Sequence, residues 1–216
     1  MATDWGPRAS ASRVKLAVFM LCLVPLARLL IGAFTRALGA NPIEAITHST
    51  GTWTLAFLLI TLGVTPLRRL AGWNWLLRLR RMLGLYAFFY AVLHFFTYIW
   101  LDQFFDFAAI VKDVIKRPFI TVGFTSFLLL LPLAATSTAA MVKRLGAKNW
   151  LALHRLVYAI AVGGVVHYWW LVKKDVTQPA IYAAVLVLLL GLRLLLRVCE
   201  RAAAAVPGNP ARSRAA

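Results

Sequence analysis

Six long apolar segments constrain this chain more than any other feature of its sequence. They cover residues 16–34, 53–67, 82–101, 119–136, 150–172 and 180–198. A helix that crosses the hydrocarbon core of a bilayer needs about 20 mostly apolar residues. The second segment is shorter than that, so we expect its helix to tilt or to extend back through Thr50 and Gly51. The pattern predicts an all-α integral membrane protein, a bundle of six transmembrane helices.

Composition supports this class and excludes several others. Of the 216 residues, 62% are hydrophobic and 14% are charged, whereas an ordinary soluble domain is roughly half apolar and about a quarter charged. The net charge of +17 does not indicate a nucleic-acid partner, because too little of the chain is polar enough to form a solvated basic face. Cys22 and Cys199 are too few and too far apart for a disulfide framework.

The positive charges instead predict the orientation in the membrane. With six spans, one side of the bilayer would carry both termini and 16 Lys or Arg residues against two acidic ones, and the other side six against five. Basic residues collect on the cytoplasmic side, so both termini are predicted there. We expect a cytoplasmic segment at 1–15, a transmembrane domain at 16–200 and a disordered cytoplasmic tail at 201–216. Residues 104–115 have the spacing of an amphipathic helix on the membrane surface.

Two of the four histidines lie at similar depth in different spans. His94 is 12 residues into the third segment and His167 is 17 residues into the fifth, which places them roughly 18 and 25 Å from the cytoplasmic ends. Two imidazoles on facing helices can hold a b-type haem iron from both sides. The alternative is a hydrogen bond between helices. The neighbouring residues favour haem, because aromatic side chains offer apolar surface and glycines leave room for a large planar ligand. They are Phe95, Phe96, Tyr98, Tyr168, Trp169, Trp170, Gly163 and Gly164.

The other two histidines leave alternatives open. His154 is 13 residues before His167, so the two would be about 20 Å apart and about 140° apart around an ideal helix. Arg81, and no histidine, is at the matching height of the third span, so His154 is predicted as a haem ligand, a hydrogen-bonding group or part of a flavin or quinone site. His48 is expected in a loop before the second span, either solvated or in contact with quinone or haem. Arg193, near the end of the sixth span, is expected to extend toward the membrane surface.

Several different short motifs follow one another in a characteristic order between residues 41 and 182. They cover residues 41–42, 47–51, 65–68, 80–85, 91–94, 116–118, 136–141, 150–158 and 167–168. In this order the chain resembles the MsrQ family, the haem-binding membrane subunits of bacterial protein-methionine-sulfoxide reductase systems. That family is a short branch of the ferric-reductase-like transmembrane superfamily.

The resemblance implies a cofactor set and partners. It implies haem b with His94, His154 and His167 as iron ligands, a family position of less defined role at His48, and FMN with no assigned residues. It further implies a multi-pass protein of the bacterial inner membrane that carries electrons from the quinone pool to a periplasmic MsrP-type molybdoenzyme subunit, which repairs oxidised methionine in envelope proteins. The chain would then be an electron-transfer subunit without catalytic side chains.

Two other functions remain open at this stage. One is a ferric-reductase-like cytochrome b that acts directly on metal ions or quinone. The other is a small proton or cation transporter without haem, which would usually show internal repeats or paired half-helices. A visible haem spectrum would exclude the transporter, and a bound periplasmic molybdoenzyme would distinguish the two cytochromes.

Overall fold

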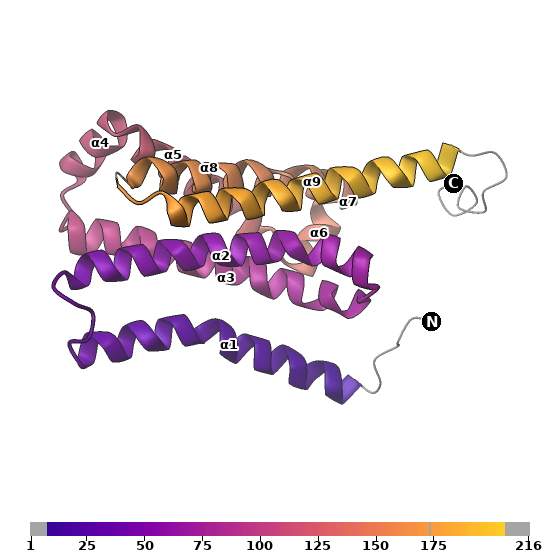
Figure 1. The fold of residues 1–216 in the computed structure, drawn as a ribbon, viewed down its shortest axis with the longest axis horizontal. Helices are drawn as coiled ribbons and strands as arrows, with labels where there is room; N and C mark the ends of the chain where they lie inside the picture. The colour runs from indigo at the N-terminus through magenta and orange to yellow at the C-terminus, as the bar shows by residue number, and fades with distance from the viewer. Residues whose placement is uncertain (1–7, 173, 206–216) are drawn as a thin grey trace.

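The computed structural model describes residues 8–172 and 174–205, and these residues are helical apart from short connections (Figure 1). A 3-10 turn, η1 (Asn74–Leu76), leads into α3, and a π-helical turn, η2 (Tyr98–Asp102), continues it. The α-helices are α1 (Arg8–Phe34), α2 (Pro42–Ala71), α3 (Leu77–Thr97), α4 (Phe107–Lys116), α5 (Pro118–Ala135), α6 (Ala139–Leu145), α7 (Ala147–His154), α8 (Leu156–Leu171) and α9 (Thr177–Ala205).

The predicted number of spans is confirmed. Six segments of the described chain are long and apolar enough to cross a membrane: Ser12–Phe34, Pro42–Ala71, Asn74–Asp102, Pro118–Ala135, Ala147–Leu171 and Thr177–Ala202. The first residues of α1 and the last residues of α9 lie at the same end of the bundle (Figure 1). The chain is therefore an all-helical, multi-pass membrane protein. Most of the tail expected at 201–216 lies outside the described residues.

The second span begins earlier than its apolar run. Asn41 caps α2, because its side chain accepts a hydrogen bond from the Glu44 N–H at 3.3 Å, and Pro42 occupies the first turn. A proline without an N–H suits this position, where the backbone donor would have no partner in the helix. The expected loop around His48 is thus wrong: this residue lies in the second turn of α2.

The fifth span is broken at Arg155, between α7 and α8. The Arg155 N–H bonds the Ala152 carbonyl at 3.2 Å, and the Tyr158 N–H bonds the Arg155 carbonyl at 3.1 Å. Bonds between residues three apart wind the chain more tightly than an α-helix does. The 140° separation expected between His154 and His167 assumed one continuous helix and does not apply.

A helix, α4, forms within the segment predicted to lie on the membrane surface, and it starts later than predicted. Asp106 caps it by accepting a hydrogen bond from the Ala109 N–H at 3.0 Å. Phe104 and Phe105 lie outside the helix, with positive φ angles of 46° and 62°. Figure 1 shows α4 at the end of the bundle opposite the first residues of α1 and the last residues of α9, and α4 packs against α5.

Helices α2, α3, α5 and α8 surround the part of the bundle that matters for function. α2 is central and packs mainly against α3 and α9, while α5 packs against α8 and also contacts α3. Their most buried residues include Leu62 of α2, Ala87 and Tyr90 of α3, and Ala161 of α8, all with at most 1% of their surface exposed. Helices α3 and α8 both contribute lining residues to one cavity, among them Ala87 and Gly164.

Candidate cofactor site

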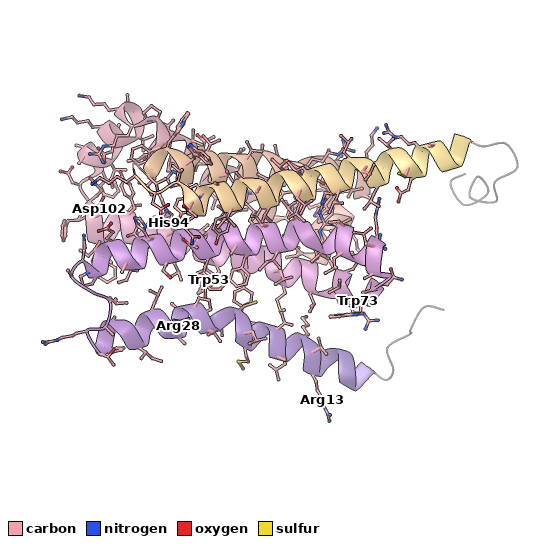
Figure 2. All side chains as sticks on the ribbon, in the orientation of Figure 1. Arg13, Arg28, Trp53, Trp73, His94 and Asp102 are labelled. Atoms are coloured by element: carbon pink, nitrogen blue, oxygen red, sulfur yellow. The ribbon has the colours of Figure 1, made fainter. Side chains whose placement is uncertain are left out.

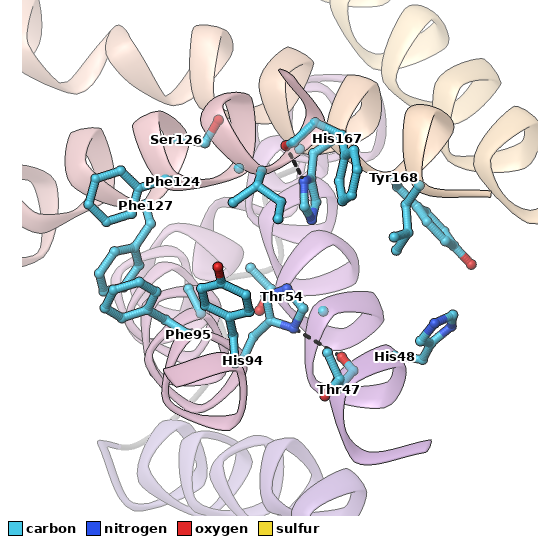
Figure 3. A pocket seen from close by; sticks show the side chains of 18 of the residues that line it. Thr47, His48, Thr54, His94, Phe95, Phe124, Ser126, Phe127, His167 and Tyr168 are labelled. Atoms are coloured by element: carbon cyan, nitrogen blue, oxygen red, sulfur yellow. Dashed lines mark hydrogen bonds between the residues drawn. The ribbon is translucent and has the colours of Figure 1, made fainter. Parts of the chain in front are cut away.

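The imidazoles of His94 on α3 and His167 on α8 face each other near the end of the bundle that carries α4 (Figures 2 and 3). Their ring centres are 6.1 Å apart, and their planes are inclined at 77°. A metal–imidazole bond is roughly 2 Å long, and the ring centre lies about 1 Å beyond the nitrogen, so two imidazoles on opposite sides of one metal have centres about 6 Å apart. The observed separation therefore fits a pair of axial ligands.

Each ring is held by a backbone carbonyl. His94 Nδ1 lies 3.0 Å from the Thr47 carbonyl oxygen, and His167 Nδ1 lies 2.6 Å from the Phe119 carbonyl oxygen. A carbonyl can only accept, so each Nδ1 carries the proton and donates it. Each Nε2 then keeps a free lone pair, the form in which histidine binds metals. Thr50 Oγ1 lies 3.4 Å from His94 Nδ1 and adds a weaker contact.

The two rings open into a cavity of about 690 Å³. Binding sites for small molecules and cofactors have volumes of roughly 300–1,000 Å³ and mostly apolar walls with a few polar groups. The walls here include Phe95, Phe124, Phe127, Leu130 and Tyr168, and polar side chains lie only at some positions, among them Asn41, Glu44, His48, Asp102 and Arg117. Size and lining both suit a large planar ligand with an acidic edge.

Glycines line the cavity and leave room in it. Of the two glycines that were expected there, only one is found in the lining. Gly164 lines the cavity as predicted, whereas the space beside Gly163 is taken by the Ser126 side chain. Gly51 and Gly123 also line it, and sequence reasoning missed them as site residues. The sequence around them carried no signal, because the role of each glycine depends on a histidine of a neighbouring helix.

His48 lies on α2 and lines the same cavity. Its side chain is 46% exposed, and its Nε2 lies 3.9 Å from a carboxylate oxygen of Glu44, one turn earlier. Figure 3 shows it set apart from the His94 and His167 pair. The structure thus brings three of the four histidines to one cavity.

His154 does not line this cavity. It ends α7, its ring stacks on Trp150 with centres 3.9 Å apart, and its Nδ1 lies 3.1 Å from the Trp150 carbonyl oxygen. Its Nε2 is buried and has no hydrogen-bond partner among the described residues. His154 therefore belongs to a different part of the bundle, where its imidazole interacts with the backbone of Trp150 and Leu133.

Arg193 was expected to extend toward the membrane surface, and that prediction is wrong. The side chain is 8% exposed and points into the bundle. It donates from Nη1 to the Tyr158 hydroxyl at 2.6 Å and from Nη2 to the Leu62 carbonyl, and it lies over the Tyr158 ring. Its Nε is buried without a partner among the described residues. An arginine buried in this way needs such partners, because an isolated charge is costly inside a membrane.

Comparison with known proteins agrees with the motifs. Residues 50–165 match the family described as the ferric reductase like transmembrane component. The chain is 58% identical over 183 residues to a protein of Herminiimonas arsenicoxydans, covering 84% of each chain. It is 58% identical over 188 residues to one of Azospira oryzae, covering 87% of this chain and 81% of the relative. It is 57% identical over 190 residues to one of Ralstonia nicotianae, covering 87% and 88%.

All three relatives carry the same name, protein-methionine-sulfoxide reductase heme-binding subunit MsrQ. The identity extends over more than four fifths of the chain, including both helices that carry the facing histidines. By this similarity the chain belongs to the MsrQ family, within the ferric-reductase-like transmembrane proteins.

Proposed function

We propose that this chain is a membrane cytochrome b subunit that carries electrons from the quinone pool across the bacterial inner membrane to a periplasmic MsrP-type molybdoenzyme, which reduces methionine sulfoxide in envelope proteins. The chain supplies the imidazoles, the apolar cavity and the docking surface. Haem b, when bound, supplies a one-electron iron couple. No side chain of the chain itself makes or breaks a bond with the final substrate.

One observation carries the haem assignment. His94 and His167 present unprotonated Nε2 atoms from opposite walls of one cavity, with ring centres 6.1 Å apart. A haem iron needs only two axial ligands from the protein. The apolar walls would lower the dielectric constant and exclude water, while Arg117 and His48 at the polar part of the lining suit carboxylate groups.

The position of the cavity supports transfer to an outer partner. His94 and Asp102, which line the cavity, lie at the end of the bundle opposite the first residues of α1 and the last of α9 (Figure 2), the end that carries α4 (Figure 1). We propose that the end with the termini is cytoplasmic, because 16 of the Lys and Arg residues belong to that side. The cavity would then lie near the periplasmic face, and the segment 102–118 would contact the molybdoenzyme.

The opposite end of the bundle is proposed to accept the electrons. Two guanidinium N–H donors and one imidazole nitrogen there are buried without a hydrogen-bond partner among the described residues: Arg193 Nε, Arg68 Nε and His154 Nε2. The positive charge of Arg80 lies near both His154 and Arg193 and repels a positive charge on either. The two guanidinium donors fit an anionic ligand rich in acceptors, such as FMN, and the carbonyls of a quinone. His154 would hold FMN or ligate a second haem, and the haem-to-protein ratio decides between one haem and two.

Haem content of purified variants tests the assignment. His94→Ala and His167→Ala are each expected to lose most of the reduced-minus-oxidised signal of the haem in this cavity, with total haem quantified as pyridine haemochrome. Val92→Ala and Val162→Ala are matched controls, because they shorten lipid-exposed side chains on the same two helices. Retention of a full haem signal in both histidine variants would overturn the assignment.

A cytochrome that reduces metal ions or quinone directly would use the same haem cavity. The two functions differ in their partner. Affinity purification from membranes is expected to recover a periplasmic molybdoenzyme, and reduced haem in the purified protein is expected to be reoxidised by that enzyme plus methionine sulfoxide. Reoxidation by ferric chelates alone, with no response to the molybdoenzyme, would support the direct reductase instead.

A further inference from the structure

Two glycines lie directly against the two facing histidines. A Cβ atom added at Gly51 of α2 would lie 3.0 Å from His94 Cε1 and 3.1 Å from its Nδ1. A Cβ atom added at Gly123 of α5 would lie 2.6 Å from His167 Nδ1 and 2.8 Å from its Cε1. Neither imidazole could keep its place beside an alanine, and the conflict is larger at Gly123.

The same arrangement is built twice, on different helices. The carbonyl that holds His94 belongs to Thr47, four residues before Gly51, and the carbonyl that holds His167 belongs to Phe119, four residues before Gly123. In an α-helix the carbonyl of residue i faces the N–H of residue i+4. Each imidazole therefore lies against one helical turn that begins with an accepting carbonyl and ends with a glycine.

We propose that Gly51 and Gly123 are positioning residues for the axial imidazoles. The absence of a Cβ lets the backbones of α2 and α5 approach the ring edges closely enough for the carbonyls to accept the Nδ1 protons. These bonds fix the tautomer, and they fix the ring planes at 77° to each other. The proposal rests on the proposed haem function, since it concerns how the two ligands are presented to the iron.

The hydrogen bonds also set how strongly the imidazoles donate. An Nδ1–H that donates to a carbonyl makes Nε2 more basic. A more basic ligand stabilises ferric over ferrous iron, so weakening the bond is expected to raise the midpoint potential. Gly51 and Gly123 thus act on the potential through the hydrogen bonds that the carbonyls of α2 and α5 accept from the two imidazoles.

Other helical glycines in the same bundle provide matched controls. A Cβ at Gly63 would lie 3.7 Å from Leu189 Cδ2, an ordinary contact, and one at Gly191 would have nothing within 4 Å. Alanine raises helix propensity at all four positions. Differences between the two pairs of variants therefore report the contact with the histidines and not the change of residue type.

The experiment compares G51A and G123A with G63A and G191A in the purified full-length protein. The readouts are haem content, midpoint potential and the EPR signal of ferric haem, whose anisotropy depends on the angle between the ligand planes. We expect G51A to keep haem with a shifted EPR signal and a more positive potential. We expect G123A to lose haem or its low-spin signal. The two controls should match the unsubstituted protein in all three.

The outcomes separate this proposal from the proposed function. If the unsubstituted protein binds haem through His94 and His167 but G51A and G123A leave the potential and the EPR signal unchanged, the glycine proposal is overturned while the haem site stands. If the unsubstituted protein binds no haem, the proposed function itself fails. Should G123A not yield folded protein by size-exclusion chromatography, the milder G51A decides, because there the ring needs to move only a few tenths of an ångström.

Discussion

Replacing Tyr90 with phenylalanine removes a hydroxyl that joins α1 to the rest of the bundle. This hydroxyl donates to the Cys22 carbonyl at 2.9 Å and accepts from the Leu26 N–H at 3.1 Å, and Tyr90 has no exposed surface. In a regular α-helix those two backbone groups would bond each other. A side chain inserted between them is a known cause of helix bending, and α1, with Pro25 inside it, bends near its middle (Figure 1).

The expected magnitude follows from two lost hydrogen bonds. Each contributes about 0.5–1.5 kcal/mol to stability in proteins generally, and hydrogen bonds between membrane helices average about 0.6 kcal/mol. Tyr90→Phe should therefore lower the free energy of unfolding by about 1–2 kcal/mol. Tyr86→Phe removes one bond, to the Phe19 carbonyl at 3.0 Å, and should have about half the effect.

Reversible unfolding in mixed micelles with increasing SDS, followed by tryptophan fluorescence, measures these differences. Tyr182→Phe is the control, because its hydroxyl has no hydrogen bond to another described residue and its ring contact with Tyr168 is kept. Equal stability of Tyr90→Phe and the unsubstituted protein would refute the bridging role of the hydroxyl. So would a larger loss in Tyr86→Phe than in Tyr90→Phe.

Three further perturbations have defined outcomes. Arg193→Leu removes a buried cation and its bond to Tyr158, so bound flavin measured by fluorescence after extraction should fall while haem content stays; unchanged flavin would contradict the proposed receiving site. Arg36 has a positive φ of 56° at the end of α1, so Arg36→Gly should raise the free energy of unfolding by roughly 0.5–1 kcal/mol, whereas Thr35→Gly should not. Removing haem from the purified protein should lower its Tm, because a ligand that binds only the folded state stabilises it; an equal Tm for the two forms would contradict a built-in site.

Helix number and histidine depth could be predicted from the sequence because both depend on counting along one chain. Each span can be identified by the length of its apolar segment, and a rise of 1.5 Å per residue places His94 and His167 at similar heights. Whether the two rings point toward each other depends on the rotation and packing of α3 and α8. In the structure the two rings face each other, with their centres 6.1 Å apart.

Contacts between helices could not be predicted in the same way. Gly51 and Gly123 matter because neighbouring helices bring a histidine onto them, and nothing local to either glycine reveals this. Arg193 lies among leucines on both sides, so periodicity does not tell whether its side chain turns inward. His48 was misplaced in a loop because the polar first turns of α2 do not look like a span, although Asn41 and Pro42 form a helix start.

Near-infrared magnetic circular dichroism of the ferric protein tests the central claim most directly, because its charge-transfer band identifies the axial ligands of a haem iron. The account predicts low-spin ferric haem with two neutral imidazole ligands, lost on replacement of either His94 or His167. A high-spin ferric haem, or a ligand pair other than two imidazoles in the unsubstituted protein, would contradict it.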